Sequence, residues 1–373
     1  MMKHMGSTYI YPRVLRAAKR TTLQPEVDTS MSEIKNVHDN KPKTPKVGFG
    51  GAALGNLNER ISEAQADATI EEAYAAGIRY FDTSPLYGLG LSELRLGHLL
   101  RALPRDEFML STKVGRYMVP PRGEVIDNGI WTAPLPMKPV FDYSYDGTLR
   151  SLEQSILRLG VEFIDIVFIH DIDRQAHGAS FDRCFDIAMN GAYRALCELR
   201  KAGYIGAIGV GINEADVATQ FVQAAEFDYL MLAGRYTLLD QSALESFLPA
   251  ALEKHVGVIA AGVFNSGILA QATPATFDYV EAPAAIVKRV RSIAEICSRH
   301  GVPLQAAAAQ FPFGHPAIKT VVLGMMKAQQ VRQNLDWIET PIPSELWDEL
   351  KHEKLLPRDV PVPLATNVGS SNR

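Results

Sequence analysis

The feature that most limits the fold of this chain is a strand followed by a helix, repeated eight times from residue 47 onward. Each repeat starts with a short apolar run, reaches a glycine or a polar turn, and continues into an amphipathic helical pattern. Regular alternation of this kind gives right-handed crossovers and a parallel sheet. Eight such units in one run predict a closed (β/α)8 TIM barrel rather than an open doubly wound sheet. We expect strands at 47–54, 78–82, 108–114, 164–170, 207–212, 228–233, 257–264 and 320–324.

Two of the helical patterns carry start signals. Ser62 with Gln65 three residues later reads as a capping box, and Gly77 follows the end of that helix. Ser92 and Glu93 open the next helix. GFGGAALG (48–55) is rich in glycine but lacks the Gly-x-Gly-x-x-Gly spacing, so a Rossmann half is not supported. We expect the remaining helices at 148–160, 190–202, 214–225, 242–255, 284–300 and 327–338.

One connection is too long for a simple turn between a strand and a helix. More than 30 residues separate Lys113 from the helix expected at Thr148, and they are rich in proline, glycine and aromatic side chains. Loops of this length in compact domains are usually functional or disordered. We therefore predict a long loop after the third strand that covers a substrate at the barrel mouth. For its proline-rich middle, a plain surface excursion is an equal alternative.

Composition excludes several classes of function. Of the 373 residues, 47% are hydrophobic and 21% charged, which supports a large core, and the net charge of −4 gives no reason to expect nucleic acid as a partner. No apolar run approaches the roughly 20 residues that a bilayer span needs, so no membrane is expected. Cys184, Cys197 and Cys297 fit neither a disulfide framework nor a zinc site. We expect a reducing, cytoplasmic location and no metal.

Both ends of the chain differ from its middle. Residues 1–45 are first basic and then polar, and the KPKTPK run (41–46) lies at their end. We interpret them as a disordered tail or the product of an upstream start codon, with a targeting segment as the alternative. The barrel is expected over 46–356, and 357–373 is expected to be a C-terminal tail.

Four ionisable side chains stand at or just after the ends of three neighbouring expected strands. Asp82 ends the second strand, and Tyr87 follows in its loop. Lys113 comes at the end of the third strand and His170 at the end of the fourth. In a closed barrel these strand ends meet at one mouth, where chemistry is placed. Each residue alone has an ordinary structural explanation, but the four together do not.

The types of these residues suggest proton transfer. Lys113 directly after an apolar strand needs a buried partner, and Asp82 is the obvious one. An ammonium beside a phenol favours phenolate and lowers the pKa of the phenol, which would make Tyr87 a usable acid and base. His170 can donate a hydrogen bond that orients a carbonyl or hydroxyl oxygen toward that tyrosine.

In this order, the four residues resemble the catalytic tetrad of the aldo-keto reductases. The runs FDTSPLYGLGLSELRLGHLL (81–100), STKVGR (111–116), SLEQSILRLGVEFIDIVFIH (151–170) and VVLGMMKAQQVRQNL (321–335) are similar to that family as well. The resemblance covers roughly residues 45–340. It implies an oxidoreductase in which the pyridine nucleotide carries the hydride and Tyr87 moves the proton.

Other runs look closer still to a subgroup of that family. LYGLGLSE, VFDYSYDGTLRSLEQS and FIHDIDRQAHG resemble D-threo-aldose 1-dehydrogenases (L-fucose dehydrogenases) and pyridoxal 4-dehydrogenases. The leading hypothesis is oxidation of the hemiacetal of an L-fucose-like sugar to its lactone. The alternatives are a pyridoxal 4-dehydrogenase, a broad NADPH-dependent carbonyl reductase and a non-enzymatic regulatory subunit. A small sugar or aldehyde is the expected partner, and the sequence favours no oligomeric state.

The resemblance also assigns residues to the nucleotide. Ala233 and Ala261 stand at about the positions of the family's usual Gln and ring-stacking Tyr, so the segment after the seventh strand is expected to contribute instead. NADP-preferring relatives have a Lys and an Arg where this chain has Gly324 and Gln330. Because neither of these two positions is basic here, we predict NAD as the preferred cofactor. Lys327 and Arg332 are cations close to these positions, so NADP is the second cofactor. The expected contacts are Asn213, Gly262, Phe264, Asn265, Ser266, Gly267, Gly324, Met325, Lys327, Gln330, Gln333 and Asn334.

Overall fold

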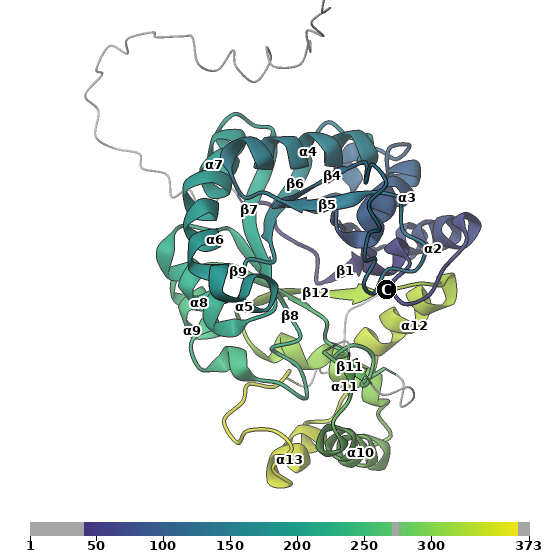
Figure 1. Cartoon of the computed structure of the whole chain (residues 1–373). Coiled ribbons are helices and arrows are strands. Elements are labelled where there is room, and N and C mark those ends of the chain that lie inside the picture. The colour runs from purple at the N-terminus through teal and green to yellow at the C-terminus, as the bar shows by residue number, and fades with distance from the viewer. Residues whose placement is uncertain (1–40, 271–275, 279, 365–373) are drawn as a thin grey trace, which may run out of the picture. The chain divides into compact units, whose positions relative to one another are not determined.

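Eight parallel strands close into a barrel in the computed structural model, which describes residues 41–270, 276–278 and 280–364 (Figure 1). Their order around the barrel is β1-β12-β9-β8-β7-β6-β3-β2, so the predicted (β/α)8 barrel is confirmed. The strands are β1 (Val47–Gly50), β2 (Tyr80–Asp82), β3 (Met109–Val114), β6 (Ile164–His170), β7 (Ile205–Ile212), β8 (Tyr229–Ala233), β9 (Gly257–Ala261) and β12 (Ile318–Gly324).

Two strands end earlier than expected. The run 47–54 leaves the sheet after Gly50 and turns into a 3-10 helix, η3 (Gly51–Gly55). The run 257–264 ends at Ala261 because Gly262 has a left-handed backbone with φ +61°. Apolar composition alone does not show where a strand ends, since both continuations are also buried or apolar.

Large side chains fill the inside of the barrel. Tyr80, Phe168 and Tyr229 belong to one buried cluster contributed by several strands. They fit because glycines stand opposite them. A Cβ atom at Gly209 would lie 2.4 Å from the ring of Phe168, and one at Gly48 would lie 2.6 Å from the ring of Tyr80. Alternation of large and small residues is how a small barrel is filled.

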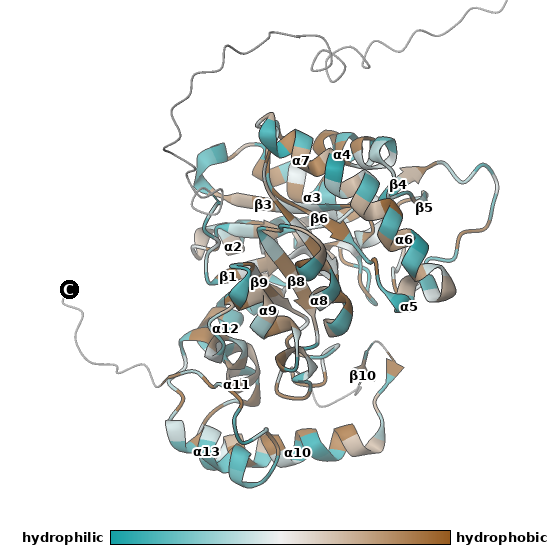
Figure 2. Ribbon diagram, turned by 90° about the vertical axis from the view of Figure 1, so that its left-hand side faces the viewer, coloured by the Kyte–Doolittle hydropathy of each residue, from teal (hydrophilic) through white to brown (hydrophobic). Residues whose placement is uncertain are grey.

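Helices surround the barrel, and they alternate hydrophilic and hydrophobic residues along their length (Figure 2). In both views α10 and α13 lie next to each other at the lower end. The bounds are α2 (Glu63–Ala75), α3 (Leu91–Leu100), α4 (Tyr145–Leu159), α5 (Arg174–His177), α6 (Phe181–Ala188), α7 (Arg194–Lys201), α8 (Ala215–Ala224), α9 (Phe247–Glu253), α10 (Ala284–Arg299), α11 (Leu304–Gln310), α12 (Ala328–Glu339) and α13 (Ser344–His352).

The helix starts correct some of the sequence predictions. The Ser62 hydroxyl accepts the Gln65 N–H at 3.1 Å, but the Gln65 amide donates to Met326 O at 3.0 Å instead of closing the capping box. Ser92 lies inside α3, where its hydroxyl donates to Gly51 O at 2.7 Å. The helix expected at 190–202 begins as a π-helical turn (Met189–Tyr193), which directly follows α6 and leads into α7.

The segment after β3 crosses the carboxyl ends of β1 and β2. It forms an antiparallel hairpin of β4 (Arg116–Val119) and β5 (Lys138–Phe141), joined by residues 120–137, which we term the covering loop. Three backbone hydrogen bonds clasp this loop to the loops after β1 and β2: Thr132 N to Asn56 O (2.9 Å), Asn58 N to Ile130 O (2.9 Å) and Leu135 N to Gly88 O (3.1 Å). The long excursion therefore reaches the barrel mouth.

The described ends of the chain also contact the barrel. The Lys41 ammonium donates to His255 O at 2.6 Å, the Tyr229 hydroxyl donates to Pro42 O, and the Thr320 hydroxyl donates to that of Thr44 at 2.6 Å. At the other end Val360 is buried. Residues 1–40 and 365–373, most of the two predicted tails, lie outside the described residues.

Candidate active site

A buried ion pair joins the ends of β2 and β3. The Lys113 ammonium donates to both carboxylate oxygens of Asp82, at 2.7 and 2.9 Å, and to Thr83 O at 2.8 Å. The Ser111 hydroxyl donates to the same carboxylate at 2.7 Å. The side chains of Lys113 and Asp82 are 1% and 3% exposed. Burial raises the pKa of Asp82, while Lys113 and Ser111 oppose that shift.

The phenol ring of Tyr87 lies beside this pair. The Lys113 nitrogen is 4.7 Å from the centre of the ring, within cation–π range. Tyr87 opens the 3-10 turn η4 (Tyr87–Gly90), which follows β2. The ring of His170 meets it edge-on at 6.1 Å, and the ring of Trp131 from the covering loop lies 5.7 Å away. The structure thus brings all four residues of the predicted tetrad together at one mouth.

The imidazole of His170 is held from both edges. Its Nδ1 lies 3.2 Å from the Ser84 hydroxyl and 3.4 Å from the guanidinium of Arg116, which can only donate. The proton of the neutral ring therefore belongs on Nε2, which lies 3.3 Å from a carboxylate oxygen of Asp171. Burial, with the charges of Arg116 and Lys113, lowers the pKa of His170 well below its usual value. His170 is thus a neutral donor at physiological pH.

Arg116 and Asp171 form a charged pair at this mouth to which the sequence analysis assigned no role. The Arg116 guanidinium donates to Asp171 Oδ2 at 2.8 Å and stacks on the ring of Phe141 at 4.0 Å. Asp171 directly follows β6 and has a left-handed backbone with φ +52°. The positions of Asp171 after a strand end and of Arg116 after Gly115 were the available signals, but their pairing depends on the path of the chain after β3.

A cavity of about 200 Å³ lies beside this cluster, at the carboxyl ends of β6 to β9. Four of the residues predicted to contact the nucleotide line it: Asn213, Gly262, Asn265 and Ser266. Asp171 and Asp173 line its other side. The Asn213 side-chain amide donates to Asp173 Oδ2 at 3.1 Å.

This cavity fits part of an extended dinucleotide. The side-chain oxygen of Asn265 is buried and accepts no hydrogen bond within the described ranges, so it needs a donor from outside. Its amide nitrogen donates to Gly234 O at 3.2 Å. Asn265 and Ser266 both have left-handed backbones, with φ +44° and +57°, a type of strain that persists at ligand-binding sites.

A second group of predicted contacts surrounds the start of α12, away from that cavity. The side-chain oxygen of Gln330 accepts from Met326 N (2.7 Å) and Lys327 N (3.0 Å), so it caps the helix. The Asn334 amide lies 3.4 Å from Gly324 O, and Met325 is fully buried, which leaves only its backbone for a ligand. Gly324, Lys327 and Gln333 are exposed.

The last two predicted contacts do not line the cavity. The ring of Phe264 packs edge-on against Trp337 at 5.9 Å. Gly267 provides a left-handed turn with φ +100° that ends this segment. Of the two nearby cations, Arg332 is paired with Glu72, and Lys327 stands at the cap of α12.

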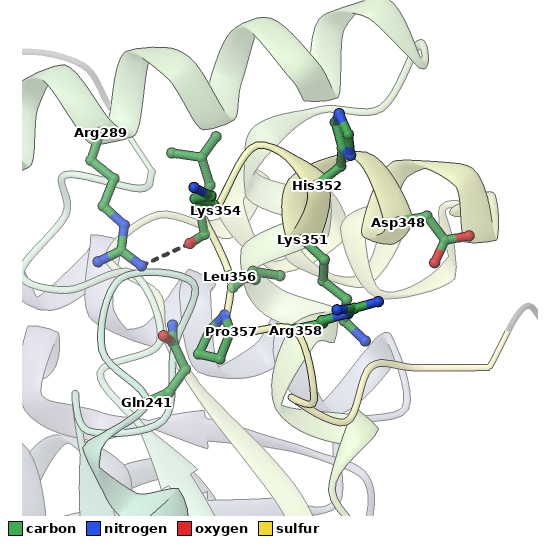
Figure 3. Close-up of a pocket in the computed structure, with 10 residues that line it drawn as sticks. Gln241, Arg289, Asp348, Lys351, His352, Lys354, Leu356, Pro357 and Arg358 are labelled. Atoms are coloured by element: carbon green, nitrogen blue, oxygen red, sulfur yellow. Dashed lines mark hydrogen bonds between the residues drawn. The ribbon is translucent and has the colours of Figure 1, made fainter.

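A larger groove of about 1180 Å³ lies elsewhere, between α10, α13 and residues 354–358 (Figure 3). Arg289 on its wall donates to Leu355 O at 2.7 Å. None of the residues predicted for the tetrad or the nucleotide lines this groove.

Over residues 41–270, 276–278 and 280–364 we find no helix long and apolar enough to cross a membrane. The same part of the chain contains no group of three or more His, Cys, Asp or Glu side chains arranged to hold a metal.

Comparison with known proteins agrees with the geometry. The profile of the aldo/keto reductase family matches residues 46–353. A pyridoxal 4-dehydrogenase of Microbacterium luteolum is 42% identical over 83% of this chain and 94% of its own length. A D-threo-aldose 1-dehydrogenase of a Pseudomonas species is 41% identical over 84% of this chain and 95% of its own length. The chain belongs to the aldo/keto reductase family, and it is an NAD(P)-dependent oxidoreductase.

Solved structures show the same fold. The glycerol dehydrogenase of Gluconobacter oxydans aligns with a TM-score of 0.66 over 90% of this chain and 100% of its own, at 22% identity. An aldo-keto reductase of Bacillus halodurans in its holo form aligns with a TM-score of 0.65 over 84% of this chain and 93% of its own, at 24% identity. At these identities the likeness concerns the barrel alone.

Proposed function

We propose that this protein is an NAD-dependent aldose 1-dehydrogenase that oxidises the cyclic hemiacetal of an L-fucose-like sugar to its lactone. The observation that carries the proposal is the Tyr87 ring, placed 4.7 Å from the Lys113 ammonium and edge-on to His170. The D-threo-aldose 1-dehydrogenase, 41% identical, supports the class of substrate. We expect the reaction to run in the cytoplasm, with a small sugar and the nucleotide as its reactants.

Each residue of the tetrad has a distinct part in this chemistry. Asp82 holds Lys113 in place through the two short hydrogen bonds. Lys113 favours the phenolate form of Tyr87 by its charge. Tyr87 then takes the proton of the anomeric hydroxyl, and His170 donates from Nε2 to the same oxygen. Bound NAD supplies the hydride acceptor for the anomeric C–H, so the C–H and O–H bonds give way to the C=O bond of the lactone.

The surrounding residues exclude water and hold the nucleotide. Trp131 lies beside Tyr87, with ring centres 5.7 Å apart, and is itself only 8% exposed, so it would help to screen the reacting atoms from solvent. Asn213, Asn265 and Ser266 would hold the part of the nucleotide that lies over the cavity. The residues around the start of α12 would hold the adenosine half.

Charge around α12 supports the preference for NAD. A 2′-phosphate needs a free arginine or lysine, and a planar guanidinium serves best. Arg332 is engaged by Glu72, and the side chain of Gln330 is used as a helix cap. Lys327 alone offers a weaker, exposed charge.

The test is NAD reduction followed at 340 nm with L-fucose and with pyridoxal, at mildly alkaline pH. Tyr87→Phe should abolish turnover and leave the Kd for NAD within about threefold, because the phenol acts on the transition state. Loss of NAD binding in that variant would contradict the role assigned to Tyr87.

Pyridoxal 4-dehydrogenase activity is the second candidate, favoured by the relative that is 42% identical. Pyridoxal also closes into a cyclic hemiacetal, so the same four residues would serve. Turnover with pyridoxal alone would select this candidate. Activity with neither compound, together with NADPH-dependent reduction of simple aldehydes, would overturn the proposed direction and cofactor. Absence of all turnover would favour a regulatory subunit.

A further inference from the structure

The carboxylate of Asp171 stands where it can touch a substrate that His170 holds. Nδ1 of His170 is occupied by Ser84 and Arg116, so Nε2 is the edge of the ring that remains for a substrate oxygen. Asp171 Oδ1 lies 3.3 Å from that nitrogen. Its side chain is 16% exposed and lines the cavity that also contains Asn213. The donor and the carboxylate are therefore neighbours at one accessible point.

The hydrogen bonds of Asp171 leave it able to accept another. A carboxylate has about four acceptor sites. Arg116 fills one with a short contact of 2.8 Å, whereas the contacts from His170 (3.3 Å) and Asn213 (3.4 Å) are longer than ordinary hydrogen bonds. Among the residues that the structure describes, two of the three side chains that donate to this carboxylate thus form only weak contacts.

Because Nε2 of His170 carries a single proton, it can donate to the substrate oxygen or to Asp171, but not fully to both. When a reacting oxygen takes the Nε2–H bond, Asp171 Oδ1 loses its histidine donor. A hydroxyl on the carbon next to the reacting carbon can replace that donor when the two oxygens are gauche, because such vicinal oxygens lie close enough together to contact two neighbouring polar groups. A substrate without this hydroxyl leaves a largely buried carboxylate with one donor fewer, which is costly.

The local structure around Asp171 costs folding free energy, which a loop with only a structural role would not need to spend. The side chains of Arg116 and Asp171 are 8% and 16% exposed, so both charges lose much of their hydration. Asp171 also holds a left-handed backbone, and strain of this kind gathers at functional sites. Arg116 fixes Asp171 from the far side, since its guanidinium is itself stacked on Phe141.

We propose that Asp171 is a specificity-determining residue that accepts a hydrogen bond from the hydroxyl adjacent to the reacting carbon, with Arg116 as its positioning residue. The inference rests on the proposed function for the contact between His170 and the reacting oxygen, and it deepens that function by selecting 2-hydroxy aldehydes and aldoses. Pyridoxal carries its phenol one carbon further away, so the inference favours the sugar.

The experiment compares two aldehydes that differ only in this hydroxyl, lactaldehyde and propanal, in the reductive direction with NADH. The quantity measured is the ratio of kcat/KM for lactaldehyde to kcat/KM for propanal. In Asp171→Asn this ratio should fall about tenfold relative to wild type, because a hydrogen bond to a charged acceptor is replaced by one to a neutral acceptor. Comparison between variants cancels the different intrinsic reactivity of the two aldehydes.

Two further variants serve as controls for this experiment. Asp171→Asn leaves Arg116 without its partner, so the double variant Arg116→Met/Asp171→Asn, which has no unpaired charge here, is measured as well and should show the same fall. Asp216→Asn makes the same chemical change on a carboxylate that is 67% exposed, and its ratio should equal that of wild type. Circular dichroism and the Kd for NADH report whether each variant is folded.

An unchanged ratio in both Asp171 variants would overturn the inference, as would a wild-type enzyme without preference for lactaldehyde. A preference that disappears in the variants supports it, even if L-fucose is not oxidised. That last combination would refute the proposed sugar dehydrogenase and leave the role of Asp171 standing.

Discussion

Replacing Lys113 by Met removes the ammonium that neutralises Asp82 and keeps most of the length of the side chain. Asp82 would then retain the Ser111 hydroxyl at 2.7 Å as its remaining side-chain donor. With the two side chains 1% and 3% exposed, the structure provides almost no water to solvate the carboxylate that is left. Breaking a buried pair of this kind costs about 3–5 kcal/mol of unfolding free energy.

The cost depends on pH in a direction that can be worked out. Burial already raises the pKa of Asp82, and without Lys113 nothing of opposite charge opposes it. A carboxyl whose pKa is higher in the folded than in the unfolded protein favours folding at low pH and loses that contribution as the pH rises through the folded pKa. The deficit of Lys113→Met should therefore be larger at pH 7 than at pH 5.

The assay is urea unfolding of wild type, Lys113→Met, Asp82→Asn and the double variant, followed by tryptophan fluorescence. The double variant should lose clearly less than the sum of the single losses, because it leaves no unpaired charge. Lys138→Met breaks the exposed ion pair with Glu124 and should change stability by less than about 1 kcal/mol. Additive losses, or a deficit for Lys113→Met below about 1 kcal/mol, would refute the reasoning.

Three further predictions concern the histidine, the covering loop and the cofactor. Because the pKa of His170 is lowered by burial and by the charges of Arg116 and Lys113, the unfolded chain binds the proton first and the unfolding free energy falls as the pH drops below about 6.5. His170→Gln should make that fall shallower between pH 7 and pH 5, and an equal slope in urea titrations would contradict this. Trp131→Ala should lower kcat/KM for the sugar about tenfold or more by loosening the wall beside Tyr87, whereas Trp131→Phe should lower it less; equal effects of the two variants would speak against a role of the ring. Gln330→Arg should raise the ratio of kcat/KM with NADP to kcat/KM with NAD about tenfold, because the guanidinium can bind the 2′-phosphate. The variant should also lose about 1 kcal/mol of unfolding free energy, since the helix cap is lost. An unchanged ratio would show that the 2′-phosphate binds elsewhere.

The barrel and the tetrad were accessible from sequence because they follow from local patterns. Apolar runs bounded by turn residues mark the strands, and the topology of a closed barrel then brings Asp82, Lys113 and His170 to one mouth. Side chains that join segments far apart in sequence escaped prediction. Gln65 fits the local capping motif, yet its side-chain amide donates to Met326 O beside the neighbouring helix α12.

The pair of Arg116 and Asp171 shows the same limit. Neither residue type is unusual after a strand, and their contact requires both the turn at Gly115 and the left-handed backbone of Asp171. Sequence periodicity describes which face of an element is buried, but it does not describe the path of a loop. The charged pair beside the histidine could therefore be found only in three dimensions.

The few hydrogen bonds that attach the covering loop to the barrel have a consequence for the rate of turnover. The side-chain amide of Asn56 donates to Ala133 O, 77 residues along the chain, in addition to the three backbone hydrogen bonds of Ile130, Thr132 and Leu135. A segment held by so few bonds opens far more often than the barrel unfolds. If this opening admits substrate and releases product, it also limits turnover. Changes that speed or slow deuterium uptake at the backbone amides of Thr132 and Leu135 would then change the turnover rate in the same direction. Dilute urea would lower the enzyme activity at concentrations that leave the barrel folded.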